Sequence, residues 1–220
     1  MNAIDKIKIL IVDDHPIFCL GMTELINKAD DLVVCGSADT PRKACQSILE
    51  LEPDLVIVDI SLKDSSGIDL IQEINSRFQK LPVLVLSMYD ESLYAERAIL
   101  AGARGYLMKQ EAIPVVVDAI HQVLEGKLYA SDEVKKKVFQ RLMSPQGPVH
   151  TSPLDQLTGR ELEVFRHIGE GLSTREIADR MHLSIKTIGT YRERIKEKLN
   201  LKHYTELVKV AVHWLQQTQK

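Results

Sequence analysis

The sequence of 220 residues contains only three cysteines and no long apolar run. Cys19, Cys35 and Cys45 are an odd number without Cys-x-x-Cys spacing, so neither a disulfide framework nor a zinc site is indicated. All three lie in apolar segments, and we expect buried, unreactive thiols in a reducing, cytoplasmic setting. No apolar run approaches the roughly 18 residues that a membrane span requires, so we expect no membrane partner.

Charge is divided unevenly along the chain, although the net charge is only −3. Residues 1–131 hold 12 basic and 20 acidic side chains, whereas residues 151–220 hold 12 basic and nine acidic ones. This asymmetry predicts two domains with different partners. Between them, "SPQGPVHTSP" (144–153) has the proline, glycine and serine content of a linker. The predicted division is a front domain over 1–130, a linker with a helix over 131–153, and a rear domain over 154–220.

Five short apolar runs alternate with helical patterns in the front half. They are "KILIV" (8–12), "LVVCGS" (32–37), "LVIVD" (55–59), "VLVLS" (83–87) and "GYLM" (105–108). Because most of these runs are apolar throughout, both faces of each strand are predicted to be buried. The pattern predicts a doubly wound α/β domain, with helices on both faces of a five-stranded parallel sheet.

Chemistry in open α/β sheets is found beyond the carboxyl ends of the strands. The residues at those ends are Asp13, Asp14, Asp59, Ser87 and Lys109. Three converging carboxylates would repel one another unless a divalent cation lay between them. Hard oxygen ligands suit Mg²⁺, which is therefore the expected cofactor.

Asp59 is the candidate nucleophile of this group. A carboxylate can attack a phosphoryl group to form an aspartyl-phosphate. Charge on the phosphoryl oxygens must be neutralised, and Mg²⁺, Lys109 and the Ser87 hydroxyl could share that role. Each residue also has a purely structural interpretation, since Asp14 could cap the following helix and Lys109 and Ser87 could be ordinary surface groups.

The motifs "VDDH", "VIVDISLKDSSG", "VLSMYD" and "GARGYLMK" resemble the receiver domain of bacterial two-component response regulators over roughly residues 6–127. The resemblance implies a flavodoxin-like (CheY-like) fold and transfer of a phosphoryl group from a sensor histidine kinase to Asp59. It implies that Asp14 and Asp59 ligate Mg²⁺ directly with the backbone carbonyl of Ser61, and that Asp13 acts through water. It further implies that Ser87 engages the phosphoryl oxygens and that Tyr106 is an aromatic switch.

The rear half contains three sequence patterns that predict the start of a helix. In "LTGREL", "LSTREI" and "LSIKTI", a leucine precedes the N-cap residues Thr158, Ser173 and Ser184, and the first two segments have glutamate at the third helical position. Helix starts this close together predict a helix-turn-helix. With a fourth helix from about His203, the rear domain is predicted to be an all-α bundle of four helices.

The third of these helices is amphipathic and basic. We expect Ile188, Tyr191, Ile195 and Leu199 to face inward. Five basic residues against two acidic ones suit contacts to DNA phosphates, although an ordinary solvated surface helix has similar charges. The candidate DNA-binding residues are Lys186, Thr187, Gly189, Thr190, Arg192, Glu193, Arg194 and Lys196.

Residues 154–217 resemble the NarL/LuxR-type (FixJ-like) DNA-binding domain. The resemblance implies that the third helix enters the major groove and that Gly189, Thr190 and Glu193 occupy the base-reading positions. We hypothesise that Thr190 packs on a thymine methyl group and that Glu193 accepts from a cytosine amino group. Glu193 could equally form a salt bridge with Lys196 or Lys186.

The joint interpretation is a phosphorylation-dependent transcriptional regulator. Its expected partners are a sensor histidine kinase, double-stranded promoter DNA and a second copy of itself in a homodimer. We expect no enzymatic turnover beyond self-catalysed phosphoryl acceptance and hydrolysis. A phosphatase of the haloacid dehalogenase type would need a second acid where Ser61 stands. A regulator that signals without phosphorylation would not need the complete set of strand-end residues.

One further amphipathic segment, "SDEVKKKVFQRLM" (131–143), carries Val134, Val138, Leu142 and Phe139 along or beside one stripe. It could pack on either domain or join a dimer interface. The sequence does not choose between these positions.

Overall fold

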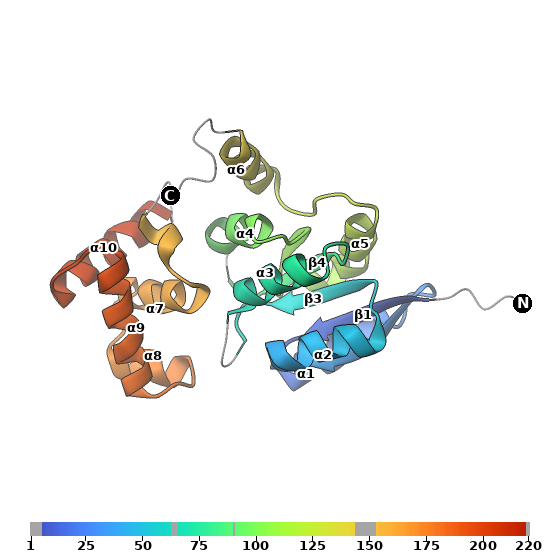
Figure 1. Cartoon of the computed structure of the whole chain (residues 1–220), viewed down its shortest axis with the longest axis horizontal. Coiled ribbons are helices and arrows are strands. Elements are labelled where there is room, and N and C mark those ends of the chain that lie inside the picture. Colours follow the sequence, from blue (N-terminus) through green and yellow to red (C-terminus); the bar gives the residue numbers. More distant parts are fainter. Residues whose placement is uncertain (1–5, 63–65, 90, 144–152, 219–220) are drawn as a thin grey trace, which may run out of the picture. The chain divides into compact units, whose positions relative to one another are not determined.

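The computed structural model describes residues 6–62, 66–89, 91–143 and 153–218. They belong to two compact units, residues 1–144 and 145–220 (Figure 1). The proline-rich part of the predicted linker lies outside the described residues. The first unit extends beyond residue 130, the predicted limit of the front domain, because it includes the next helix.

Five parallel strands form the sheet of the first unit, in the order β2-β1-β3-β4-β5. They are β1 (Ile7–Val12), β2 (Leu32–Ala38), β3 (Leu55–Asp59), β4 (Val83–Ser87) and β5 (Gly105–Met108). The last three coincide with the predicted runs, and the first two are one residue longer. β3 and β4 are buried along their whole length, because helices cover both sides of the sheet. The doubly wound α/β fold is confirmed.

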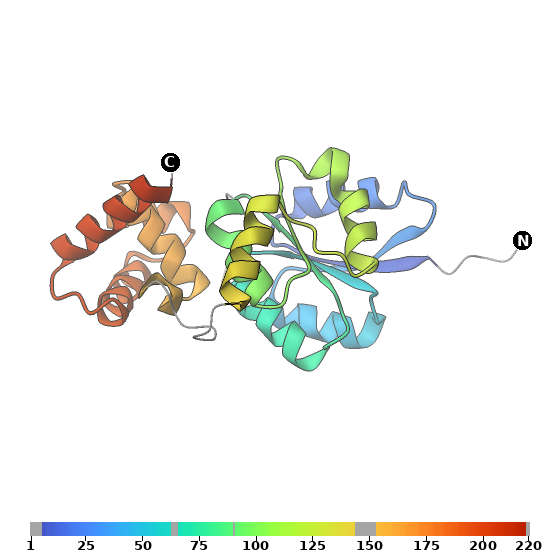
Figure 2. The same ribbon diagram turned by 90° about the horizontal axis from the view of Figure 1, so that it is seen from above.

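Helices cover the two faces in two groups (Figure 2). One face carries α1 (Pro16–Ile26) and α5 (Ala112–Leu124), which share an apolar core with the sheet. The other face carries α2 (Pro41–Leu51), α3 (Gly67–Arg77) and α4 (Glu91–Leu100).

Gly67 begins α3 against the end of β3. A Cβ at this position would lie 2.2 Å from the carbonyl oxygen of Asp59, so only glycine allows the helix to start there. The Gly67 amide donates to the Ile60 carbonyl at 2.9 Å. This approach fixes the backbone that carries Asp59.

The connecting segment, residues 127–142, is attached to the sheet edge through the backbone of Tyr129. The Tyr106 amide donates to the Tyr129 carbonyl at 2.8 Å, and the Tyr129 amide donates to the Arg104 carbonyl at 3.0 Å. A short parallel bridge therefore lies along the outer side of β5.

The second half of the connecting segment is α6 (Asp132–Leu142), which packs on α4. The Ser131 amide donates to Glu91 at 2.8 Å, and Arg141 pairs with Glu96 at 2.8 Å. Val134 and Val138 are buried, whereas Phe139 and Leu142 remain exposed. The sequence allowed this helix to pack on either domain or to join a dimer interface. In the structure it packs on the first unit.

The second unit contains α7 (Gly159–Gly169), α8 (Thr174–Arg180), α9 (Ile185–Lys198) and α10 (Tyr204–Thr218). A short 3₁₀ helix (Pro153–Gln156) precedes them. Thr158 and Ser173 form complete capping boxes, and Ser184 accepts a hydrogen bond from the Thr187 amide. The three predicted helix starts are therefore confirmed. α10 and α9 both pack on α7, and α8 packs on α9.

The cysteines differ in burial. Cys45 is buried, but Cys19 and Cys35 are only partly buried, so the expectation of three buried thiols is wrong for these two. Burial still raises the pKa of all three thiols, and in Cys19, where the Asp13 charge adds to it, the pKa reaches about 11. In the described part of the chain, no helix is both long enough and apolar enough to cross a bilayer.

Candidate functional site

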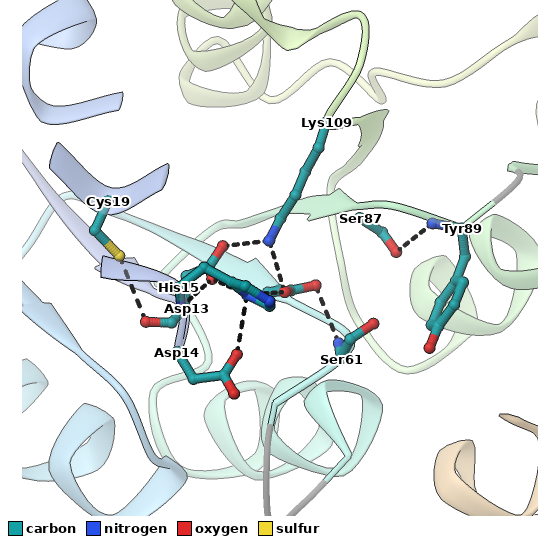
Figure 3. Close-up of polar contacts among 9 residues, drawn as sticks. Asp13, Asp14, His15, Cys19, Ser61, Ser87, Tyr89 and Lys109 are labelled. Atoms are coloured by element: carbon teal, nitrogen blue, oxygen red, sulfur yellow. Dashed lines mark hydrogen bonds and ion pairs between the residues drawn. The ribbon is translucent and has the colours of Figure 1, made fainter. Parts of the chain in front are cut away.

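Three carboxylates meet at the carboxyl end of the sheet (Figure 3). Asp13 and Asp14 follow β1, and Asp59 is the last residue of β3. Asp13 and Asp59 are 4% and 1% exposed, so little water is available to solvate their charges. The Lys109 ammonium lies 2.5 Å from Asp13 Oδ2 and 2.7 Å from Asp59 Oδ2. The structure thus brings these four predicted residues together.

The charges in this acidic pocket depend strongly on one another. Burial raises the pKa of Asp59, the Lys109 charge opposes that rise, and the Asp13 charge adds to it. Burial also disfavours the charged ammonium of Lys109, but the Asp59 and Asp13 carboxylates outweigh it and raise the pKa of Lys109. The Ser61 amide donates to Asp59 Oδ1 at 3.0 Å, which fixes the orientation of the carboxylate.

His15 is a member of the pocket that sequence reasoning missed. Its Nδ1 lies 3.0 Å from Asp13 Oδ1, 3.2 Å from Asp14 Oδ1 and 3.9 Å from Asp59 Oδ2. The ring stands among the three carboxylates while its side chain stays 60% exposed. Its position directly after the aspartate pair was the available signal.

The pocket fits a divalent cation. One ligand atom from each of Asp13, Asp14, His15 and Asp59 lies within 4.8 Å of the others. Within the described residues, the buried Oδ1 of Asp14 accepts no hydrogen bond and has only the His15 ring as an ionic neighbour. Carboxylate oxygens are the hard ligands that suit Mg²⁺, which binds one or two of them and keeps several of its waters. The Ser61 backbone lies beside them through its bond to Asp59.

Ser87 and Tyr106 both bond the backbone of Tyr89 rather than the acidic pocket. The buried Ser87 hydroxyl accepts from the Tyr89 amide at 3.1 Å and points toward it (Figure 3). The Tyr106 hydroxyl donates to the Tyr89 carbonyl at 2.9 Å, and the Tyr106 side chain is 2% exposed. Tyr89, whose ring stacks on Tyr94, is thus a second residue that sequence reasoning missed.

In the second unit, α9 carries the predicted DNA-binding residues. Ile188 and Ile195 are buried as expected, whereas Tyr191 and Leu199 are half-buried. The exposed predicted residues are Lys186, Thr190, Glu193 and Arg194; the half-buried ones are Thr187, Gly189, Arg192 and Lys196.

Several of these side chains already have partners within the unit. The Thr190 hydroxyl donates to the Lys186 carbonyl at 3.1 Å, which turns a polar atom toward the helix backbone. Glu193 pairs with Lys196 at 2.7 Å, one of the two salt bridges considered from the sequence.

Arg192 lies on the inner flank of α9. It donates to Thr174 at 2.5 Å and stacks over the Tyr204 ring at 3.7 Å, so its guanidinium links three helices. A Cβ added to Gly189 would meet no atom within 4 Å, so the backbone there is open to an approaching molecule.

Comparison with known families identifies both halves of the chain. The response regulator receiver domain matches residues 9–121, and the luxR family of bacterial regulatory proteins matches residues 155–211. Response regulator GacA of Pseudomonas aeruginosa is 32% identical over 206 residues, covering 94% of this chain and 95% of its own. Oxygen regulatory protein NreC of Staphylococcus carnosus is 31% identical, covering 93% and 96%.

Solved structures give the same result. The Salmonella typhimurium response regulator RcsB is similar with a TM-score of 0.55 and 25% identity, covering 94% of this chain and 98% of its own. RcsB from Salmonella enterica serovar Typhimurium, bound to promoter rprA in the presence of phosphomimetic BeF3-, is similar with a TM-score of 0.56 and 25% identity, covering 93% and 97%.

Proposed function

The chain belongs to the LuxR-type two-component response regulators, in which a receiver domain is joined to a DNA-binding domain, and we propose that Asp59 is its phosphoacceptor. The observation that carries this proposal is the contact between Asp59 Oδ2 and the Lys109 ammonium in a pocket of three carboxylates. A buried nucleophile beside a fixed cation is suited to attack on a charged phosphoryl group.

In the proposed reaction, a carboxylate oxygen of Asp59 forms a bond to phosphorus. The bond between phosphorus and the histidine nitrogen of the kinase breaks, and its electron pair leaves with the nitrogen. The Ser61 amide holds the Asp59 carboxylate in orientation, and Lys109 turns its ammonium toward the phosphoryl oxygens. Asp14, Asp59 and the Ser61 carbonyl would hold Mg²⁺, with Asp13 acting through water, and the ion would supply further neutralisation of those oxygens.

The switch then runs through the backbone of Tyr89. Ser87 turns its hydroxyl from the Tyr89 amide toward a phosphoryl oxygen, and the carbonyl of the same residue, Tyr89, holds Tyr106. The Tyr106 amide in turn holds Tyr129 of the connecting segment. Three consecutive contacts therefore lead from Ser87 to Tyr129, in the connecting segment that precedes α6, and a chain of this kind is suited to a two-state switch.

The proposed output is binding of double-stranded promoter DNA by α9. The helix presents Lys186 and Arg194 for phosphate contacts and Thr190 and Glu193 for base contacts, with Thr187, Gly189, Arg192 and Lys196 beside them. The promoter-bound structure of RcsB supports this role. We further propose a sensor histidine kinase as phosphodonor, a homodimer as the phosphorylated DNA-binding form, and action in the cytoplasm.

The proposed division of labour follows the predicted domains. Residues 1–130 act as the receiver, residues 131–153 connect, and residues 154–220 bind DNA. The chemistry is limited to self-catalysed phosphoryl acceptance and hydrolysis. Ser61, two residues after the nucleophile, cannot act as the second acid that a phosphatase of the dehalogenase type requires.

Replacement of the nucleophile tests this proposal. The full chain, Asp59→Ala and the matched exposed control Asp39→Ala are incubated with acetyl phosphate and Mg²⁺, and the acyl-phosphate adduct is measured by intact-protein mass spectrometry. We expect a labile adduct on the wild type and on Asp39→Ala, and none on Asp59→Ala. Undiminished labelling of Asp59→Ala would refute the assignment, and fast turnover of the donor without an accumulating adduct on the wild type would indicate an enzyme instead.

A further inference from the structure

The ammonium of Lys109 has a third neighbour besides the two carboxylates. It lies 4.3 Å from the centroid of the Phe18 ring. We propose that Phe18 is a positioning residue for phosphoryl transfer, because the face of its ring holds the Lys109 ammonium in place while that ammonium exchanges carboxylate oxygens for phosphoryl oxygens. This inference rests on the proposed function of Asp59 as phosphoacceptor.

The ring is held firmly enough to act in this way. Phe18 lies in the first turn of α1, is partly buried, and packs against the apolar core between α1, α5 and the sheet. Lys109 directly follows β5. The contact therefore joins two elements that are far apart in the sequence, and the packed core fixes the ring on one side of the ammonium.

The surroundings of the ammonium explain why a ring is suited to this place. The Lys109 side chain is 4% exposed, so water contributes little to its solvation. Two carboxylates, Asp13 and Asp59, take up hydrogen bonds from it. The face of an aromatic ring carries partial negative charge and attracts a cation without accepting a directed hydrogen bond.

A third carboxylate or carbonyl at the same place would hold the ammonium by a directed bond that must break when the phosphoryl group arrives. The Phe18 ring leaves the N–H groups of Lys109 free to turn from one oxygen to another. The charge thus keeps its position while its N–H groups change partners, and a charge already in place is the condition for strong electrostatic stabilisation.

The alternative is that Phe18 is only a core residue. Its packing against the apolar core would by itself explain an aromatic side chain at this position. Truncation alone cannot separate the core role from the positioning role. Phe18→Leu removes both the packing of the ring and the partial negative charge on its face. Fluorine substituents separate them, since they withdraw electron density from the ring face while they increase its apolar character.

The decisive experiment replaces Phe18 in the full chain by phenylalanine carrying one, two or three ring fluorines. The rate of adduct formation at Asp59 from acetyl phosphate and Mg²⁺ is measured for each protein. We expect a stepwise fall that reaches roughly three- to tenfold in the trifluoro protein, the range expected for loss of a cation–π contact. The matched control carries the same substitutions at the exposed Phe139, where the rate should not change.

A second readout does not depend on the rate. The ring current of Phe18 should shift the Cε proton resonances of Lys109 upfield, and this shift should be lost in Phe18→Leu but kept in Phe18→Trp, with folding of both checked by thermal unfolding. A flat or rising rate through the fluorinated series would overturn the inference. Absence of any adduct on the wild type would instead overturn the proposed function, so the two failures are distinguishable.

Discussion

The two units place their functional residues in opposite surroundings. In the first unit, Asp13, Asp59 and Lys109 are almost completely buried and touch one another. In the second unit, the candidate DNA-binding residues lie along one helix, and all of them are exposed or half-buried. The comparison indicates that the buried charges of the pocket depend on one another, whereas the residues of α9 contribute separately to binding.

This difference has a simple physical origin. A buried charge that loses its partner cannot be solvated, so the penalty is large and falls on the whole group. An exposed charge that loses its partner is solvated by water, so the penalty is small and local. Single substitutions should therefore have large effects in the pocket and graded effects on α9.

Of the single substitutions, loss of Lys109 should have the largest effect. A small effect would contradict the coupling of charges in the buried pocket. In Lys109→Met, Asp13 and Asp59 lose their shared cation, and we expect the first unit to lose about 3 kcal/mol in free energy of unfolding at neutral pH. Adduct formation from acetyl phosphate should fall at least about 100-fold, the scale of losing one charge-stabilising group. Urea unfolding and mass spectrometry measure the two quantities.

The matched control for that change is Lys135→Met, because the Lys135 side chain is 44% exposed and pairs with Asp132 only at 3.7 Å. It should be nearly neutral in both assays. Mg²⁺ should restore part of the stability of Lys109→Met, since it brings a cation back to the carboxylates. A stability loss equal to that of the control would show that the pocket is not coupled.

Glu193→Ala should have the next largest effect, confined to one base pair. If Glu193 accepts from a cytosine amino group, discrimination at that position should fall by about 1–3 kcal/mol. Sites selected in vitro by the wild type and the variant would then differ at one position. Identical selected sites would assign Glu193 only to its salt bridge with Lys196.

Gly189→Ala should separate stability from binding. The added methyl group meets no atom in the free protein, and alanine is better than glycine in a helix by about 1 kcal/mol, so the second unit should become more stable. If the backbone at Gly189 approaches the duplex closely, the added methyl group should weaken DNA binding at every sequence. Thermal unfolding and fluorescence anisotropy measure the two effects. Unchanged affinity would show that the backbone at Gly189 does not approach the duplex closely.

The smallest predicted effect is a pH dependence of opposite sign in the two units. The raised pKa of Asp59 means that the folded first unit keeps a proton that the unfolded chain releases, so its stability falls as pH rises above the ordinary aspartate range. Burial disfavours the charged form of Glu161, but bonds from Lys198 and the Thr158 amide outweigh it and lower the pKa of Glu161.

The second unit therefore gains stability as pH rises from the lowered pKa of Glu161 to the ordinary glutamate range. Fluorescence of Trp214, the only tryptophan in the sequence, follows unfolding of this unit, and amide exchange follows the first. Asp59→Asn should flatten one dependence and Glu161→Gln the other. A dependence left unchanged by its substitution would contradict the assignment of that carboxyl group.

Local patterns were sufficient to predict much of this molecule. The strands from Leu55 onward were found because buried parallel strands are apolar throughout, and the helix starts at Thr158, Ser173 and Ser184 because N-caps are local contacts. The convergence of the strand-end residues followed from the rule that carboxyl ends of parallel strands meet at one edge.

The features that the sequence did not predict depend on side-chain orientation and on packing between distant elements. The alternation of residues gives no sign that the His15 ring turns into the pocket or that Phe18 lies over Lys109. The position of α6 rests on ion pairs such as Arg141 with Glu96, which an amphipathic pattern alone cannot assign to a partner. Partial exposure of Cys19 has the same cause, because it depends on how far the neighbouring side chains cover it.

The attachment of Tyr129 to β5 has a practical consequence for cutting the chain. β5 is the last strand of the sheet, so a fragment that ended at residue 126 would leave the outer amides and carbonyls of that strand uncovered. Such a fragment would also uncover the side of α4 on which α6 packs. Exposed strand edges recruit strands from other molecules and promote aggregation. A fragment that ends at residue 143 keeps both surfaces covered and is the one suited to expression, crystallisation and solution NMR.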